Sequence, residues 1–220
     1  MSIIKGLKDI NEALDKPRGN AASGPRVRWL KLEDGQSVKI RFLNEVDADS
    51  KNYNTERGLA IVCAEHTNPK DYRRKCVCTM DEEGRCYGCE MNRRDPKAGW
   101  KARLRYYTNV LVDEGTDEPY VAIWSQGVGP KSPTTTTIVE YAGDTGSITN
   151  VIWRLKRTGT GTQTSYSLFP LTTDESPFDF KGLDLYNLDE TAVRQVKYSD
   201  QEAFFMGLDA DVNASASVDW

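Results

Sequence analysis

Five cysteines and one histidine, gathered within a stretch of 27 residues, constrain this chain more than any other feature. The stretch runs from Cys63 to Cys89 and holds every cysteine and the single histidine of the 220-residue sequence. Zinc takes four tetrahedral ligands from thiolates and imidazole, and Cys86 and Cys89 have the two-residue gap of a metal knuckle. Gly88, which lies between them, is expected to allow a tight backbone turn. The pattern predicts a metal site, and a set of buried thiols or a disulfide is the alternative.

The metal ligands that we predict are His66, Cys78, Cys86 and Cys89. Cys76 competes with Cys78 for one place, because the two alternate with Val77 in a strand-like segment. At about 3.3 Å per residue their sulfur atoms would lie about 7 Å apart. Thiolates that share a zinc ion lie closer than that, so only one coordinates, and Cys78 is nearer to Cys86 in sequence. Cys63 and Cys76 are expected to be ordinary small apolar residues. Four protein ligands leave no open position, so one structural Zn2+ is expected.

The charge of the chain is unevenly distributed. The formal net charge is −4, but residues 171–220 hold eleven acidic and three basic side chains, a net charge of −8. Residues 1–170 carry the remaining +4, from 26 basic and 22 acidic residues. A basic body with an acidic end is an asymmetry that a function has to explain. No apolar run is long enough to span a bilayer and no signal peptide is evident, so cysteines at metal spacing favour a reducing cytosol.

Alternation of apolar and polar residues predicts a mainly β protein. Strand character is found in residues 38–42, 101–112, 119–124, 151–156 and 164–169. One face of the segment 101–112 would carry Leu104, Tyr106, Val110 and Val112. The other face would carry Lys101, Arg103, Arg105 and Tyr107. Residues 134–142 predict a helix that ends near Gly143. Short antiparallel strands, a single helix between them and no βαβ rhythm favour a small Greek-key barrel.

Both ends of the chain have predicted features of their own. Residues 3–15 have the apolar spacing of a short amphipathic helix, and residues 16–25 have the composition of a flexible linker. This arm could contact a neighbouring copy of the chain or dock on its own domain. Near the other end, Ser199 and Glu202 are expected to form a capping box for a helix that ends at Gly207. Residues 207–220 are predicted to be a disordered tail that recruits partner proteins through Asp209, Asp211, Asp219 and Trp220.

Basic and aromatic residues are interleaved around the predicted metal site. Single strands are bound by cationic grooves that follow the phosphates and by aromatic faces on which bases stack. The predicted nucleic-acid contacts are Tyr72, Arg73, Arg74, Arg93, Arg94, Trp100, Lys101, Arg103, Arg105 and Tyr107. A solvated basic face whose aromatic rings turn into the core is the alternative. The alternation that groups Arg103, Arg105 and Tyr107 on one side favours binding.

The residues that an enzyme would need are hard to find in this sequence. Its single histidine is assigned to the metal, and there is no phosphate-cradling glycine loop, nucleophile elbow or acidic pair at nuclease spacing. We therefore predict a protein that is not an enzyme. A zinc-ribbon protein that binds duplex DNA or regulates transcription is one alternative, although no convincing recognition helix is present. A nuclease is the other.

The order His66, Cys78, Cys86, Cys89 within a basic barrel that ends in an acidic tail resembles the single-stranded-DNA-binding proteins of tailed phages. The resemblance is to the gene-thirty-two type, the helix-destabilising proteins, especially those of phages of actinobacteria, and it covers residues 27–220. It implies an OB-fold and sequence-independent binding of single strands in DNA replication, recombination and repair. It also implies that the tail recruits replication and recombination proteins, and that the protein works in the cytoplasm of a bacterial host cell.

These predictions divide the chain into three parts. Residues 1–25 form the N-terminal arm and linker, through which copies of the chain could self-associate. Residues 26–206 form the OB-fold core, with a zinc subdomain inserted at about residues 60–98. Residues 207–220 form the acidic flexible tail. No membrane contact is expected.

Overall fold

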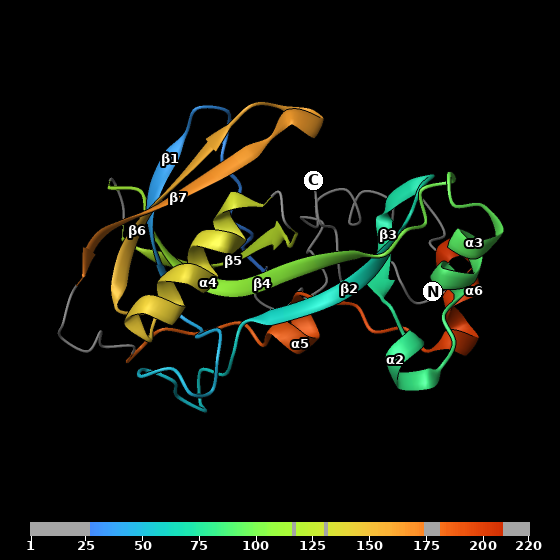
Figure 1. Ribbon diagram of the computed structural model, residues 1–220, viewed down its shortest axis with the longest axis horizontal. Helices are drawn as coiled ribbons and strands as arrows, with labels where there is room; N and C mark the ends of the chain where they lie inside the picture. Colours follow the sequence, from blue (N-terminus) through green and yellow to red (C-terminus); the bar gives the residue numbers. More distant parts are fainter. Residues whose placement is uncertain (1–26, 116–117, 130–131, 174–180, 209–220) are drawn as a thin grey trace, which may run out of the picture.

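Seven strands form one antiparallel sheet in the part of the chain that the structure describes (Figure 1). The computed structural model describes residues 27–115, 118–129, 132–173 and 181–208. The strands are β1 (Ser37–Phe42), β2 (Ile61–Asn68), β3 (Asp71–Val77), β4 (Arg103–Asp113), β5 (Tyr120–Gly127), β6 (Val151–Thr158) and β7 (Ser165–Thr173). The helices are α2 (Met80–Glu83), α3 (Tyr87–Arg94), α4 (Pro133–Thr145), α5 (Leu188–Thr191) and α6 (Tyr198–Met206), with a short 3-10 turn, η1 (Gly161–Gln163). The mainly β architecture predicted from the sequence is confirmed.

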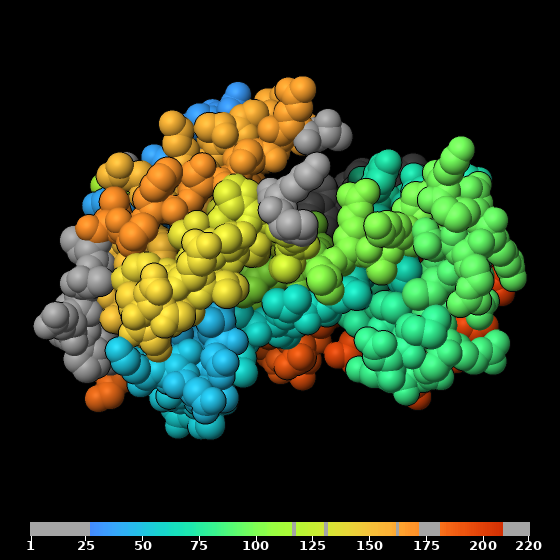
Figure 2. Space-filling model, in the orientation of Figure 1, coloured from blue at the N-terminus to red at the C-terminus, as the bar shows by residue number. Residues whose placement is uncertain are grey.

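The long strand β4 joins two lobes. Its second half pairs with β1 and its first half pairs with β2. Because β5 pairs along both halves, β1 and β2 must share the opposite edge of β4. The sheet then continues from β1 through β6 to β7, and from β2 to β3. We call β1, β5, β6, β7 and α4 the large lobe, and β3, α2, α3 and α6 the metal lobe. Figure 2 shows an indentation between the two lobes on the visible face.

Alternation along the strands sends large apolar side chains into the core of the large lobe. Buried residues from β1, β4, β5 and β6 include Ile40, Phe42, Val110, Val112, Trp124, Trp153 and Leu155. Helix α4 packs against both β5 and β7 and adds Ile138 to this core. The helix therefore covers the opening between two strands that do not pair. Pro133 begins α4, and Gly146, in the left-handed conformation with φ 79°, follows its last residue.

Two smaller apolar clusters lie outside this core. The first is the core of the metal lobe and consists of Cys76, Tyr87, Trp100, Phe204 and Phe205. The second covers the outer side of β4 and β5 and consists of Tyr107, Ile123, Leu188, Ala192 and Val193. Helix α5 and its neighbours thus form another layer over a sheet face that the sequence analysis predicts to be open.

The strands predicted from alternation overlap β1, β4, β5, β6 and β7. The predicted C-terminal helix corresponds to α6 and ends, as expected, at Gly207, whose φ is 75°. Two local predictions are wrong. Helix α4 continues past Gly143, because Gly146 provides the left-handed residue that ends it. Ser199 lies inside α6, which follows Lys197, and its hydroxyl bonds to Asp200, so it forms no capping box.

The metal region shares the sheet of the large lobe, because β2 pairs with β4 and β3 pairs with β2. In sequence it lies between β1 and β4. Leu104 was expected in the core beside Tyr106, but it is 49% exposed. Leu104 lies on the first half of β4, which pairs with β2 and extends beyond the large-lobe core.

The predicted N-terminal arm and linker, residues 1–25, and the tail beyond Leu208 lie outside the described residues. Among the helices of the described ranges, none has the length and apolar character needed to cross a membrane.

The large-lobe core should depend strongly on Trp153. Its indole is fully buried, lies against Phe42 and Tyr141, and donates a hydrogen bond to the carbonyl of Ile148. Trp153→Ala should lower the free energy of unfolding by about 3–5 kcal/mol, because it leaves a large cavity and an unpaired carbonyl. Urea denaturation measures the loss. Val139→Ala, at an exposed site on α4, is the control and should change it by less than about 0.5 kcal/mol.

Candidate metal centre

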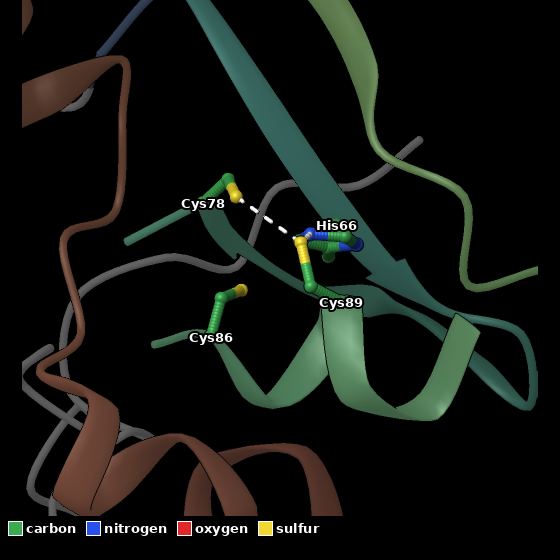
Figure 3. A group of neighbouring side chains, drawn as sticks. All are labelled: His66, Cys78, Cys86 and Cys89. Carbon is green, nitrogen blue, oxygen red and sulfur yellow. Dashed lines mark hydrogen bonds between the residues drawn. The ribbon is translucent and has the colours of Figure 1, made fainter. Parts of the chain in front are cut away.

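Four side chains from β2, the segment after β3 and the start of α3 point toward one another (Figure 3). They are His66, Cys78, Cys86 and Cys89, and their ligand atoms all lie within 4.8 Å of one another. The Sγ atom of Cys89 lies 3.3 Å from Nε2 of His66 and 3.6 Å from Sγ of Cys78. Tetrahedral ligands at about 2.3 Å from an ion lie about 3.8 Å from one another. The group can therefore hold one metal ion.

The imidazole of His66 is oriented by a backbone carbonyl. Its Nδ1 lies 2.6 Å from the carbonyl oxygen of Trp100, in the segment that leads into β4. A carbonyl can only accept, so Nδ1 carries the proton and donates. Nε2 then points toward the cysteines, and once it has lost its own proton its lone pair can bind a metal. Burial of the ring, 1% exposed, holds this orientation.

Gly88 is needed for a different reason from the one predicted. It does not have a positive φ, so the backbone there requires no glycine. A Cβ atom at this position would instead lie 2.3 Å from Cγ of His66 and 2.7 Å from its Cβ. The first turn of α3 therefore packs directly on the imidazole, and only glycine permits that approach.

The three thiols of the group differ in acidity. Burial opposes ionisation of Cys86, but hydrogen bonds from His66 and from the backbone N–H of Cys89 outweigh it and lower its pKa to about 6. Cys86 is the N-cap residue of α3, a position that favours a thiolate. Burial raises the pKa of Cys78, and it raises that of Cys89 to about 12. The thiolate of Cys86 is thus available to bind a metal at neutral pH, whereas the thiols of Cys78 and Cys89 need a metal ion in order to ionise.

The remaining cysteines lie outside the four-residue group. Cys76 is completely buried in the core of the metal lobe, and burial raises its pKa. Cys63 lies on the opposite side of β2, next to Arg105 in the pairing register. Burial raises its pKa to about 12. Both behave as the small apolar residues that the sequence analysis expects.

Gln201 supports the ligand loop, and nothing in the sequence patterns indicates this role. It is completely buried on α6. Its Oε1 accepts a hydrogen bond from the backbone N–H of Tyr87, and its Nε2 donates to Thr79 Oγ1 and to the carbonyl of Val196. Hydrogen bonds to Gln201 therefore hold both ends of the segment between Cys78 and Cys86 against α6. Its neighbours Ser199, Asp200 and Glu202 are polar as well, so the local sequence gives no signal that Gln201 is buried.

The predicted nucleic-acid contacts are divided by the structure according to their exposure. Six are exposed on the metal lobe or at the start of β4: Tyr72, Arg73, Arg93, Arg94, Lys101 and Arg103. Arg74 and Arg105 are half-buried. Arg74 pairs with Asp71 at 3.4 Å and lies over the ring of Phe204. Arg105 donates to Ser125. The tail residues Asp209, Asp211, Asp219 and Trp220 lie outside the described ranges.

Trp100 and Tyr107 are not available for base stacking, which corrects the prediction for both. The indole of Trp100 packs edge-on against Phe205, with ring centroids 5.0 Å apart, inside the metal-lobe core. Tyr107 is completely buried, and its hydroxyl donates to the carboxylate of Glu65 at 2.8 Å. Each ring is covered by a segment distant in sequence, so strand alternation alone could not indicate its burial.

Comparison with known proteins found no match for this chain. The chain matches no protein-family model and no curated protein, and it matches no solved structure. The resemblance drawn from the order of the metal ligands therefore stays a prediction. What the site can do is argued from its own geometry.

Gly88→Ala should weaken metal binding about 10- to 100-fold, because the new methyl group displaces the His66 ring from its position. Competition with a chromophoric chelator measures the affinity. Gly143→Ala is the matched control, since a Cβ there meets nothing within 4 Å, and it should leave metal affinity unchanged. Equal affinities for both variants and the parent would contradict the role given to the contact between Gly88 and His66.

Metal binding at pH 7 should release about two protons from Cys78 and Cys89, which are protonated in the metal-free group, while Cys86 contributes little. Burial opposes protonation of His66, but its hydrogen bonds with Cys86 and with the Trp100 carbonyl raise its pKa, so up to about one more proton leaves the ring. Calorimetric titration in buffers of different ionisation enthalpy counts these protons. Release of fewer than about one proton would contradict this assignment of ionisation states. Affinity should fall steadily on acidification from pH 8 to pH 5.

Proposed function

We propose that the protein binds single-stranded DNA without regard to sequence, and that it coats and protects single strands during phage DNA replication, recombination and repair. The observation that carries this proposal is a group of four basic side chains on one face of the sheet. They are Arg73, Lys75, Arg103 and Arg105, and we call this surface the cationic face. Cationic surfaces that follow the phosphates are what single-strand binding requires.

The pairing register brings the cationic face together. Thr67 is opposite Lys75 between β2 and β3, and Glu65 is opposite Arg103 between β2 and β4. Because residues two apart on a strand share a face, Arg73 lies beside Lys75 and Arg105 beside Arg103. Alternation alone groups Lys101, Arg103, Arg105 and Tyr107 along β4, and it cannot add the cations of β3, because the register of β3 is not visible from spacing.

The inner pair of cations is held in place by buried groups. Lys75 Nζ lies 3.6 Å from a Glu65 carboxylate oxygen, donates to the Tyr107 hydroxyl at 2.9 Å and stands 5.3 Å from the centre of its ring. The guanidinium of Arg105 stands 5.9 Å from the same ring. Burial lowers the pKa of Lys75, and the nearby Glu65 carboxylate raises it in part. Tyr107 thus contacts Lys75 and Arg105 from the buried side of the cationic face, and its ring does not stack on bases.

The outer pair is the part that a ligand can reach. Arg73 and Arg103 are both exposed, and their side chains make no hydrogen bond or ion pair with the described part of the chain. On the same lobe the ring of Tyr72 is 74% exposed. Because Tyr72 is adjacent to Arg73 in β3, its ring projects to the other face of the strand. The two exposed guanidinium groups offer partners to phosphates, and the exposed ring at the edge of the sheet offers a surface on which a base can stack.

The strand order supports an OB-fold for the large lobe. Strands β5-β4-β1-β6-β7 are consecutive neighbours, with α4 between β5 and β6 in sequence. We infer that they form the five-stranded, partly open barrel of that fold. In this arrangement the metal region lies in the connection between the first two barrel strands, one of the two loops through which OB-folds bind oligonucleotides.

We further propose that the metal is one structural Zn2+. Three thiolates and one imidazole match its preference for sulfur and nitrogen donors, and four protein ligands leave no position for a reacting molecule. The ion would fix α3 and the end of β3, and the protein would have no catalytic role. The acidic tail would recruit replication and recombination proteins, a proposal supported by its acidic residues and by the large ring of Trp220.

A titration of labelled single-stranded and duplex oligonucleotides of equal length, with and without magnesium, tests the function. We expect tight binding to the single strand, weaker binding to the duplex, and no cleavage in magnesium. Preference for the duplex would favour the transcription-regulator alternative, and magnesium-dependent cleavage would favour the nuclease.

Arg73→Ala combined with Arg103→Ala should make single-strand binding less dependent on salt. Each phosphate contact contributes about −0.7 to the slope of log affinity against log salt, so loss of two contacts should reduce it by about 1.4. Fluorescence anisotropy at several salt concentrations measures the slope. Lys31→Ala removes an exposed charge that belongs to none of the strands of the cationic face and should leave the slope unchanged. If the double variant and the control behave alike, the cationic face does not bind the strand.

A further inference from the structure

The outer face of β1, β6 and β7 carries an exposed aromatic ring among basic side chains. Arg154 of β6 pairs with Lys39 of β1 on one side and with Phe169 of β7 on the other. Lys156 follows in the next row, between Ser37 and Ser167. The neighbours Trp153, Leu155 and Leu168 are buried in the large-lobe core, so alternation directs this row outward. We call Lys39, Arg154, Lys156 and Phe169 the distal patch, because these strands lie at the end of the molecule far from the metal lobe (Figure 1).

The distal patch is neither neutralised nor covered by the described part of the chain. Its three cations are exposed and make no hydrogen bond or ion pair there, and the Phe169 ring, 51% exposed, contacts no other ring or cation. None of the three strands contains an acidic residue. The nearest carboxylate in the register is Asp113, opposite Lys39 at the end of β4, and it accepts a hydrogen bond from Gly115.

We infer that the distal patch is a second contact surface for single-stranded nucleic acid. A base stacks on Phe169, and Arg154, Lys156 and Lys39 bind the flanking phosphates. The inference rests on the proposed function and extends it, since it assigns part of the binding energy to strands that carry none of the predicted contacts. An exposed phenylalanine has no evident role in the fold, whereas a ring set among unpaired cations fits a ligand with alternating flat and anionic groups.

The distal patch lies on the same side of the sheet as the cationic face. The register links Lys39 to Asp113, and residues two apart along β4 continue this side through Tyr107 to Arg105. Between the two surfaces, Tyr186 covers β4 and exchanges hydrogen bonds with Asn109. Arg105 and Asp113 are eight positions apart on β4, about 26 Å at about 3.3 Å per residue. A short oligonucleotide therefore reaches one surface only, and a longer one reaches both.

Length-dependent binding tests this inference. Phe169→Ala should weaken binding of an oligothymidylate of about 16 nucleotides roughly five- to a hundredfold, the effect of one lost stacking contact, and should have a much smaller effect with about 4 nucleotides. Arg154→Ser with Lys156→Ser should reduce the salt slope for the longer strand by about 1.4. Phe169→Trp should keep the parent affinity, and the fluorescence of the new indole should be quenched when the strand binds.

Matched controls separate the possible failures. Val139→Ala removes an exposed apolar side chain from α4 and should leave the affinity for both oligonucleotides unchanged. Urea denaturation should show equal stability for all variants, because every site is exposed.

If the distal variants bind both lengths as the parent does while Arg73→Ala with Arg103→Ala loses affinity, this inference is wrong and the proposed function stands. If the parent binds no single strand, both fail. A rise in affinity for Phe169→Ala would mean that an acidic segment occupies the patch, which also overturns the inference.

Discussion

The imidazole of His66 is the contact on which the metal lobe depends. Its Nδ1 donates to the carbonyl of Trp100, its Nε2 faces the thiol of Cys89, and its ring packs against Gly88. A single side chain thus links strand β2, the segment that leads into β4, and the first turn of α3. Neither α2 nor α3 exceeds eight residues, and helices that short are not stable alone. Their position depends on the ligand group, on Gln201 of α6 and on the packing of Tyr87 in the metal-lobe core.

The two faces of β2 and β3 couple this site to the proposed function. His66 and Cys76 project toward the metal-lobe core, whereas Glu65 and Lys75 project to the opposite side. The ion and the α3–α6 pair would therefore fix, from one side, the strands that present cations on the other. Glu65 and Tyr107 complete the arrangement, because a buried carboxylate and a phenol hold Lys75 in a position that burial would otherwise disfavour. A metal without any chemical role would still determine where phosphates bind.

Sequence patterns predict the strands of the large lobe and the residues of the metal group, and physical reasons explain what they miss. Strong alternation identifies β1 and β6. The spacing limit on shared thiolates leaves one place for Cys76 or Cys78, and proximity to Cys86 in sequence favours Cys78. β2, with the sequence IVCAEHTN, buries parts of both faces and so shows no alternation. The burial of Tyr107 depends on a layer contributed by residues about eighty positions later, such as Leu188. Gly88 has the predicted importance, but its cause is a ring from another strand. Such contacts between distant segments leave no local pattern.

Hydrogen–deuterium exchange on four samples tests the central claim most directly: the protein with zinc, the same protein after chelation, and each with an excess of single-stranded DNA. The account predicts that DNA slows exchange in β3 and the first half of β4 in the zinc-loaded protein. It also predicts that chelation removes this protection and loosens α3, while β1 and β6 continue to exchange slowly. Protection by DNA that is equally strong after chelation, or that avoids both of these strands, would contradict the link between metal centre and cationic face.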